Sequence, residues 1–181
     1  MKYKKYHLKR LLHELQNRFK GSDSSSSQYN YLNIIEEAIS NEEIFNIFRS
    51  DQRYGDILEH ISDDLAREYY YKLREELSHK DIVSYCKSIK NIGSPSLKYF
   101  EKDKLNPTTL RYINVALDLN KKFPDVSFKN IIELGAGFGG QALILDKIYK
   151  INNYTFIDLP QVNKLIKKFI NLHKYGFNAH F

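Results

Sequence analysis

Apolar side chains recur at helical spacing at the start of the chain. Over residues 3–19 they form one stripe with polar residues opposite it, which predicts a basic amphipathic helix within residues 1–20. A glycine at position 21 and a run rich in serine follow. This composition is typical of a flexible polar linker, which we expect over residues 21–28.

Helical periodicity continues over residues 29–125, where we expect a region of several helices. Ser40 and Glu43 have the spacing of a capping box, which predicts that a helix begins after Ser40. One longer helix is expected over 56–77. The Asn-Pro pair at 106–107 predicts the start of another helix, because asparagine suits the N-cap and proline the first turn.

Three consecutive tyrosines, at 69–71, lie inside the longer helix. Together they could form a stacking platform for sugars or bases. Neighbouring positions of a helix point in different directions, so three consecutive rings cannot share one face. We therefore expect these tyrosines to divide between the core and the surface.

The pattern changes after Pro124. An apolar run predicts a short buried strand, a glycine cluster follows, and two more apolar segments flank a second strand. The expected order is strand 129–134, helix 141–149, strand 154–158 and helix 160–174. Strand, turn, helix and strand within about 30 residues predict a right-handed unit with two parallel strands. The fold class is therefore α/β, with a helical region followed by a partial Rossmann-like domain over residues 126–181.

Composition limits the classes of protein that this chain can belong to. Its 181 residues are 42% hydrophobic, which is enough to build a core without disulfides. A single cysteine rules out an internal disulfide, and no cluster of metal ligands stands out, so we expect no metal site and a cytoplasmic location. No apolar run approaches the ~20 residues that cross a bilayer. Charged residues interrupt the segment where a signal peptide needs an unbroken apolar stretch.

The net charge of +6 invites a nucleic-acid interpretation, but its distribution argues against one. Residues 1–20 hold seven of the 28 Lys and Arg and one of the 22 Asp and Glu, which leaves 21 of each sign in the rest. A basic arm can contact phosphates or an anionic membrane surface. It is more often a solvated helix face, so we expect no nucleic-acid partner.

The glycine cluster at 133–140 carries the clearest chemistry. Glycines between a strand and a helix allow positive φ angles and let a ligand lie against the main chain, and the helix that follows offers free N–H groups. Asp158 ends the second strand 21 positions after Gly137. About this spacing lets an acid bind the ribose hydroxyls of an adenosine-bearing cofactor.

Two cofactor classes fit these residues. Glycines at 135, 137 and 140 match the dinucleotide fingerprint, whereas Glu133 with glycines at 135, 137 and 139 matches the motif of class I S-adenosylmethionine-dependent methyltransferases. A carboxylate would repel a pyrophosphate but suits the cationic sulfonium and ammonium groups of S-adenosylmethionine. We therefore favour S-adenosylmethionine over NAD. In a purely structural alternative, the glycines form only a tight turn and Asp158 only caps the next helix.

Four segments resemble the bacterial sugar O-methyltransferases found with surface-polysaccharide genes. They are IGSP at 92–95, NPTTLRY at 106–112, IELGAGFGGQ at 132–141 and FIDLP at 156–160. The last two segments, in this order, are the most specific. The resemblance covers roughly residues 90–175, and the helical region before it fits the N-terminal part of that family.

The resemblance implies methyl transfer from S-adenosyl-L-methionine to a hydroxyl of a saccharide or nucleotide sugar, in polysaccharide biosynthesis. Glu133 would face the methionine end, and Asp158 would bind the ribose hydroxyls with Leu159 beside the adenine. Main-chain contacts would come from Gly135, Ala136, Gly137 and Gly139. Arg111 and Tyr112 would either help to close the cofactor pocket or serve only in helix packing.

The chain departs from that family in length. Class I methyltransferases resemble one another in a seven-stranded sheet. Here two strands are expected, and residues 177–181 could at most begin a third, so we expect a shortened version of doubtful activity. The missing half normally supplies the rest of the adenine pocket, the acceptor site and the catalytic base. Two parallel strands expose an edge. They must lean on the helical region, pair with another copy in a homo-oligomer, or belong to a longer protein.

No catalytic residue is selected by the sequence. Transfer to a hydroxyl needs a base within hydrogen-bond reach, and none of the six histidines lies in a motif; we expect each on a surface or helix face. Three hypotheses remain: a sugar O-methyltransferase, an NAD-type nucleotide-binding fragment, and a non-catalytic helical interaction protein with a vestigial cofactor loop.

Overall fold

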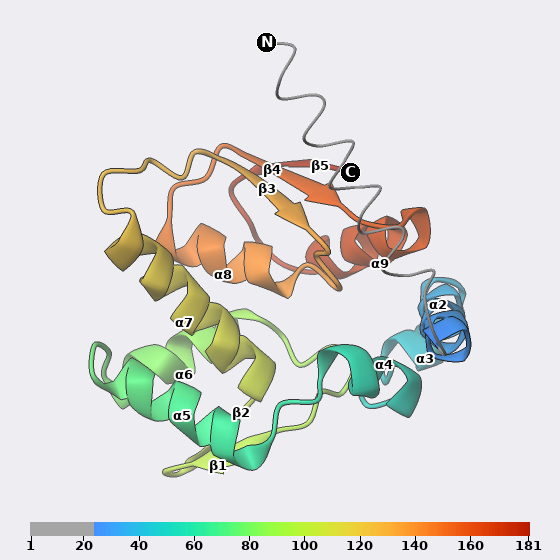
Figure 1. Cartoon of the computed structure of the whole chain (residues 1–181), viewed down its shortest axis with the longest axis horizontal. Coiled ribbons are helices and arrows are strands. Elements are labelled where there is room, and N and C mark those ends of the chain that lie inside the picture. Colours follow the sequence, from blue (N-terminus) through green and yellow to red (C-terminus); the bar gives the residue numbers. More distant parts are fainter. Residues whose placement is uncertain (1–23) are drawn as a thin grey trace.

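The computed structural model describes residues 24–181, with side chains from residue 29 onward (Figure 1). The helix expected within 1–20 lies outside the described residues. The helices are α2 (Ser24–Ser40), α3 (Glu42–Phe45), α4 (Gln52–Leu58), α5 (Asp63–Arg74), α6 (His79–Ser88), α7 (Pro107–Lys122), α8 (Gly140–Ile148) and α9 (Pro160–Ile170). The strands are β1 (Lys98–Phe100), β2 (Asp103–Leu105), β3 (Asn130–Leu134), β4 (Asn153–Ile157) and β5 (Asn178–His180).

The start of α2 corrects the predicted linker. Residues 24–28 form the first turns of α2 rather than a linker up to position 28. Serine is favoured at the start of helices, where its hydroxyl can satisfy free backbone N–H groups. The serine-rich composition is therefore compatible with the start of a helix at Ser24 as well as with a linker before it.

The capping prediction at Ser40 was wrong by one residue. The N-cap of α3 is Asn41, whose side chain accepts the backbone N–H groups of Glu43 at 2.8 Å and Ile44 at 3.3 Å. The Ser40 hydroxyl instead donates to the Glu36 carbonyl at 2.8 Å and ends α2. Two adjacent capping residue types made the sequence ambiguous, and asparagine holds the cap.

The single helix expected over 56–77 is interrupted. α4 ends at Leu58 and α5 begins at Asp63, where the Ser62 hydroxyl caps the helix by accepting the Leu65 N–H at 3.3 Å. Acids directly after this serine favour a helix start, and this local signal overrides the apolar periodicity. The expected division of the tyrosines is confirmed, since Tyr70 is 3% exposed and Tyr71 is 66% exposed.

α7 begins as the sequence predicts. The Asn106 side chain accepts the Thr109 N–H at 2.9 Å, and Pro107 occupies the first turn. The helix packs against α5 and α6 on the helical side and against α8 on the other. α7 therefore joins the helical region to the α/β part.

The sheet has three parallel strands in the order β3-β4-β5, and β5 lies within residues 177–181, where at most the start of a third strand is expected from the sequence. The Asn178 N–H donates to the Asn152 carbonyl at 2.8 Å and starts the third strand. Figure 1 shows α8 and α9 on the same side of this sheet. Two right-handed crossovers that advance in one direction place both helices on one face. The chain is a mixed α/β protein with a small parallel sheet.

The other face of the sheet is not covered by residues 29–181. Ile132 is 70% exposed and Leu134 is 44% exposed, whereas Tyr154 and Phe156 on the helix side are buried. The prediction that β3 is a buried strand was therefore wrong. Its continuous apolar run matched a strand covered on both faces, but the described helices cover only one.

The helical region packs on the far side of α8 and α9. α2 lies against α9 and α7 lies against α8, so the molecule has the order sheet, paired helices, helical region (Figure 1). Of the three alternatives for the small sheet, the described residues show the first, since the strands contact the helical region through these two helices. No helix in the described part is long and apolar enough to cross a membrane.

Candidate functional site

The carboxyl ends of β3 and β4 bring the two predicted halves of the site together. Leu134 and Ile157 are partners in the parallel register, and the Gly135 N–H donates to the Ile157 carbonyl at 2.9 Å. The Asp158 Oδ2 accepts the Gly137 N–H at 3.2 Å. The glycine turn and Asp158, 21 residues apart in sequence, are therefore in direct contact.

Three glycines of the turn have left-handed backbones. Their φ angles are +75° at Gly135, +61° at Gly137 and +84° at Gly139. A side chain is strained in this region, so the turn requires glycine at all three positions. The glycine pattern of the sequence is thus a consequence of this backbone path.

The space around each glycine of the turn shows which of them pack against neighbouring side chains and which do not. A Cβ at Gly139 would lie 2.9 Å from the Ile166 side chain of α9, and one at Gly140 would lie 2.5 Å from the Phe138 ring. A Cβ at Gly135 would meet no atom within 4 Å. The later glycines therefore allow close packing at the start of α8, and Gly135 faces open space where a ligand can approach the main chain.

Asp158 holds the turn rather than capping the next helix. Its Oδ1 accepts the Leu159 N–H at 2.8 Å, and its Oδ2 accepts that of Gly137. The N-cap of α9 is Leu159, which makes no side-chain cap bond and is 42% exposed at the rim of the site. Burial raises the pKa of Asp158. The alternative in which Asp158 only caps the next helix does not describe this geometry.

Glu133 lies on the helix-covered side of β3. Its Oε2 accepts the Tyr154 hydroxyl at 2.8 Å. Burial and, to a smaller extent, the nearby Asp158 carboxylate raise the pKa of Glu133 to about 7, against the lowering effect of the Tyr154 hydrogen bond. At neutral pH this carboxyl is therefore close to half ionised, and a cation placed beside it would favour the charged form.

Tyr112, on α7, lies at the inner side of the turn. A Cβ at Gly140 would lie 2.8 Å from the Tyr112 ring, and the Arg111 guanidinium lies 5.3 Å from the centre of that ring. Burial raises the pKa of Tyr112 to about 12. Of the two residues considered for closing the pocket, Tyr112 contacts the turn.

Side chains that the sequence did not single out cover the turn from the helical region. A Cβ at Gly137 would lie 3.2 Å from Leu58 and 3.9 Å from the Tyr54 hydroxyl, both on α4. The Tyr31 ring of α2 lies 5.7 Å from the Tyr54 ring. The Tyr54 hydroxyl is buried and has no hydrogen-bond partner among the described residues. An unpaired buried hydroxyl costs free energy. Tyr54 is fully buried and does not line the cavities described below.

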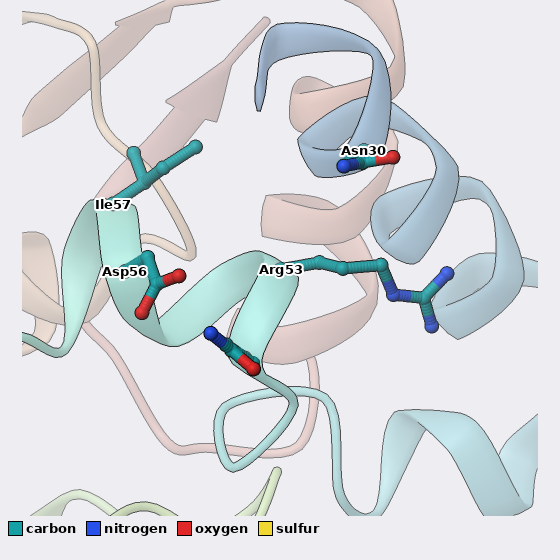
Figure 2. Close-up of a pocket in the computed structure, with 5 residues that line it drawn as sticks. Asn30, Arg53, Asp56 and Ile57 are labelled. Atoms are coloured by element: carbon teal, nitrogen blue, oxygen red, sulfur yellow. The ribbon is translucent and has the colours of Figure 1, made fainter. Parts of the chain in front are cut away.

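A cavity of about 330 Å³ lies beside this cover, between α2 and α4 (Figure 2). Asn30 and Ile57 line it, and Figure 2 shows the Arg53 side chain reaching toward α2. Arg53 is held there by Glu37 and Asp51, each at 2.8 Å. The α4 residues that line the cavity do not include Tyr54 or Leu58, so the cavity lies on another face of α4 from the one that covers the turn.

A buried ion pair ties the glycine turn to the helical region. Arg49 is 2% exposed, and its Nε donates to Glu59 Oε1 at 2.5 Å. The Arg49 guanidinium lies 4.2 Å from the centre of the Phe138 ring, inside the turn. A buried guanidinium stacked on an aromatic ring fixes that ring in place.

Three of the resembling segments meet at this pair. The Arg49 N–H donates to the Gly93 carbonyl at 2.9 Å, and its guanidinium donates to the Asn106 side chain at 3.2 Å. The Thr108 hydroxyl donates to Glu59 Oε2 at 2.8 Å. Sequence reasoning missed both charged residues. The sequence held no signal for this pair, because other charged residues, such as Asp51, Arg53 and Asp56, lie between Arg49 and Glu59.

The described histidines lie away from the turn or bond elsewhere. His173 contacts the Phe169 carbonyl at 3.0 Å, and His180 contacts Asn153 at 3.3 Å. His79 bonds to Tyr70 and Asp103, and His60 is exposed. No base for a hydroxyl acceptor is assigned. Within residues 29–181, no three metal-binding side chains come together.

Comparison with known proteins gives no match to any family model, curated protein or solved structure.

Proposed function

We propose that this chain binds S-adenosyl-L-methionine at the turn 133–139 and Asp158, as the cofactor half of a Rossmann-like sugar O-methyltransferase. The observation that carries the proposal is the contact between a turn of three left-handed glycines and an acid at the end of the adjacent parallel strand. In open α/β sheets, ligands bind outside the carboxyl ends of such strands.

The residues of the turn fit this cofactor. Gly135 leaves space for the methionine part, and each oxygen of Asp158 keeps a lone pair for a ribose hydroxyl. The exposed Leu159 offers an apolar surface to the adenine. Main-chain groups of Ala136, Gly137 and Gly139 complete the proposed contacts. When bound, S-adenosylmethionine supplies an electrophilic methyl group.

Glu133 argues against NAD. A dinucleotide places its pyrophosphate on the helix N-terminus after the turn. Where it is ionised, Glu133 would repel that group. The close packing of Gly140 against Phe138 does not separate the two cofactors, because the third glycine of the dinucleotide fingerprint also serves close packing.

Titration calorimetry of the purified chain with S-adenosylmethionine, S-adenosylhomocysteine and NAD tests this proposal. Binding of the first two and not of NAD supports it, whereas binding of NAD alone supports the dinucleotide alternative. If the folded chain binds none of them, the result favours the third hypothesis, a non-catalytic interaction protein with a vestigial cofactor loop.

We predict that Asp158→Ala weakens S-adenosylhomocysteine binding by about 1–3 kcal/mol, because a ribose hydroxyl loses its acceptor. Asp118→Ala is the matched control, because Asp118 of α7 pairs with Lys72 of α5 at the surface, away from the turn. Melting curves of both variants check that the turn still folds. An unchanged affinity in Asp158→Ala would refute the ribose role.

A further inference from the structure

A second cavity, of about 450 Å³, lies between α5 and the β1-β2 hairpin. Figure 1 shows this hairpin at the end of the molecule opposite the three-stranded sheet. Arg67, Tyr71 and Arg74 reach the cavity from α5, and Tyr99 and Glu101 reach it from the hairpin. Pockets for small ligands begin at about 300 Å³, so this cavity is large enough to hold one.

Two guanidinium groups flank the cavity. Positions 67, 71 and 74 fall on one face of a helix, so Arg67 and Arg74 stand on either side of Tyr71, about 10 Å apart along the axis. Planar guanidinium groups bind phosphate oxygens through paired hydrogen bonds. Arg74 already lies 3.6 Å from Glu101 Oε1 and donates to the Leu77 carbonyl at 3.0 Å. The face of α5 that lines the cavity is therefore suited to an anionic group through Arg67 and the remaining donor of Arg74.

Two exposed tyrosine rings border the same cavity. Tyr71 is 66% exposed and Tyr99 is 71% exposed. Exposed aromatic rings stack on sugars and bases. The Lys104 Nζ lies 4.9 Å from the centre of the Tyr99 ring. Among the lining residues, Arg67 and Arg74 are cationic and Glu101 is anionic, so the lining has a net positive charge.

The inner wall of the cavity is held by a chain of hydrogen bonds. The Tyr70 hydroxyl donates to Glu101 Oε1 at 2.7 Å and contacts His79 Nδ1 at 2.8 Å. His79 Nε2 contacts Asp103 Oδ2 at 2.9 Å, and the Tyr70 ring stacks on Phe100. These contacts join α5, α6 and both strands of the hairpin. The walls are thus in place before a ligand arrives, which favours binding.

We propose that this cavity binds a sugar phosphate ester, either a free sugar phosphate or a nucleotide. The phosphate lies between Arg67 and Arg74, and the ring stacks on Tyr71 or Tyr99. A ring hydroxyl donates to Glu101. The site is separate from the glycine turn and does not depend on cofactor binding there.

Titration calorimetry of the full chain with glucose 1-phosphate, uridine diphosphate and inorganic phosphate tests the site. At least one ring-bearing phosphate should bind ten times more tightly than inorganic phosphate, and the tighter of the two identifies a free sugar phosphate or a nucleotide. Arg67→Gln should weaken that binding at least tenfold. Tyr71→Ala should weaken it without changing the affinity for inorganic phosphate. Both side chains are exposed, so melting temperatures should not change.

Matched controls are Lys80→Gln on α6 and Tyr29→Ala on α2, both exposed and outside the cavity. Neither should change the binding. Saturation with S-adenosylhomocysteine should leave it unchanged as well, so the two proposed sites can fail separately. No binding at millimolar ligand, or binding that neither Arg67→Gln nor Tyr71→Ala weakens, would overturn the proposal.

Discussion

Burial sets the charge of Glu133, the residue on which the choice of cofactor depends. Its pKa of about 7 in the folded chain lies above the usual value of 4.5. The folded state therefore holds this proton more tightly than the unfolded state, and stability falls as pH rises from about 4.5 to about 7. The loss is at most about 3 kcal/mol, at 1.36 kcal/mol per pKa unit.

Glu133→Gln should remove this pH dependence. Glutamine keeps an acceptor for the Tyr154 hydroxyl, so at pH 8 the variant should be about 1–3 kcal/mol more stable than the parent. Urea unfolding at pH 5 and pH 8 measures both, with the exposed Glu43→Gln as control. A variant whose stability changes with pH as the parent's does would show that Glu133 is not the titrating group.

The Arg49–Glu59 pair should be far more sensitive than a comparable surface pair. Glu59→Gln leaves a buried guanidinium without its counter-charge, and we expect a loss of about 3–5 kcal/mol in the free energy of unfolding. The matched control is Glu37→Gln, which removes a partner of Arg53 in a partly exposed pair and should cost about 1 kcal/mol or less. Equal losses in the two variants, measured by urea unfolding, would contradict this account.

The sheet is an element with one covered face, and the two faces should respond differently to substitution. Ile132→Thr, on the open face, should change stability by less than about 0.5 kcal/mol. Phe156→Ala, on the helix side, should cost about 3–5 kcal/mol because it leaves a cavity. A large loss from Ile132→Thr would mean that another part of the protein covers this face.

Helix starts and turns that depend on neighbouring residues could be predicted from the sequence. Features that depend on contacts between distant parts of the chain could not. The Asn-Pro start of α7 needs only neighbouring residues, and so does the glycine turn after β3. The exposure of Ile132 depends on which face the helices cover. The third strand depends on pairing with Asn152 and β4. Neither the exposure of Ile132 nor the pairing of the third strand follows from the sequence of hydrophobic and polar residues nearby.

The candidate site divides in the same way. The spacing of Glu133, the glycines and Asp158 along the chain was enough to predict that they share a site, because they lie at the ends of neighbouring parallel strands. Tyr54 and Arg49 lie about 80 positions earlier in the chain and meet the turn only through the packing of the helical region. Periodicity marked Tyr54 and its neighbours as helical, but it could not say which surface they cover.

At the scale of the whole molecule, the turn lies where the two halves of the chain meet. α4 packs on one side of the turn, with α2 behind it through the Tyr31–Tyr54 contact. On the other side the turn leads into α8 and packs against α9. A ligand held there would bind both halves, so saturating S-adenosylhomocysteine should stabilise the entire fold. At a hundredfold excess over Kd the gain is about 2.7 kcal/mol.

The central claim is that the turn 133–139 and Asp158 hold S-adenosylmethionine. Titration of the isotopically labelled chain with S-adenosylhomocysteine, followed by amide resonances, tests it most directly. We predict that the largest shifts occur at Gly135, Ala136, Gly137 and Leu159, with little change in the β1-β2 hairpin. Saturable shifts confined to residues outside the turn and the end of β4, or no shifts at millimolar ligand, would contradict it.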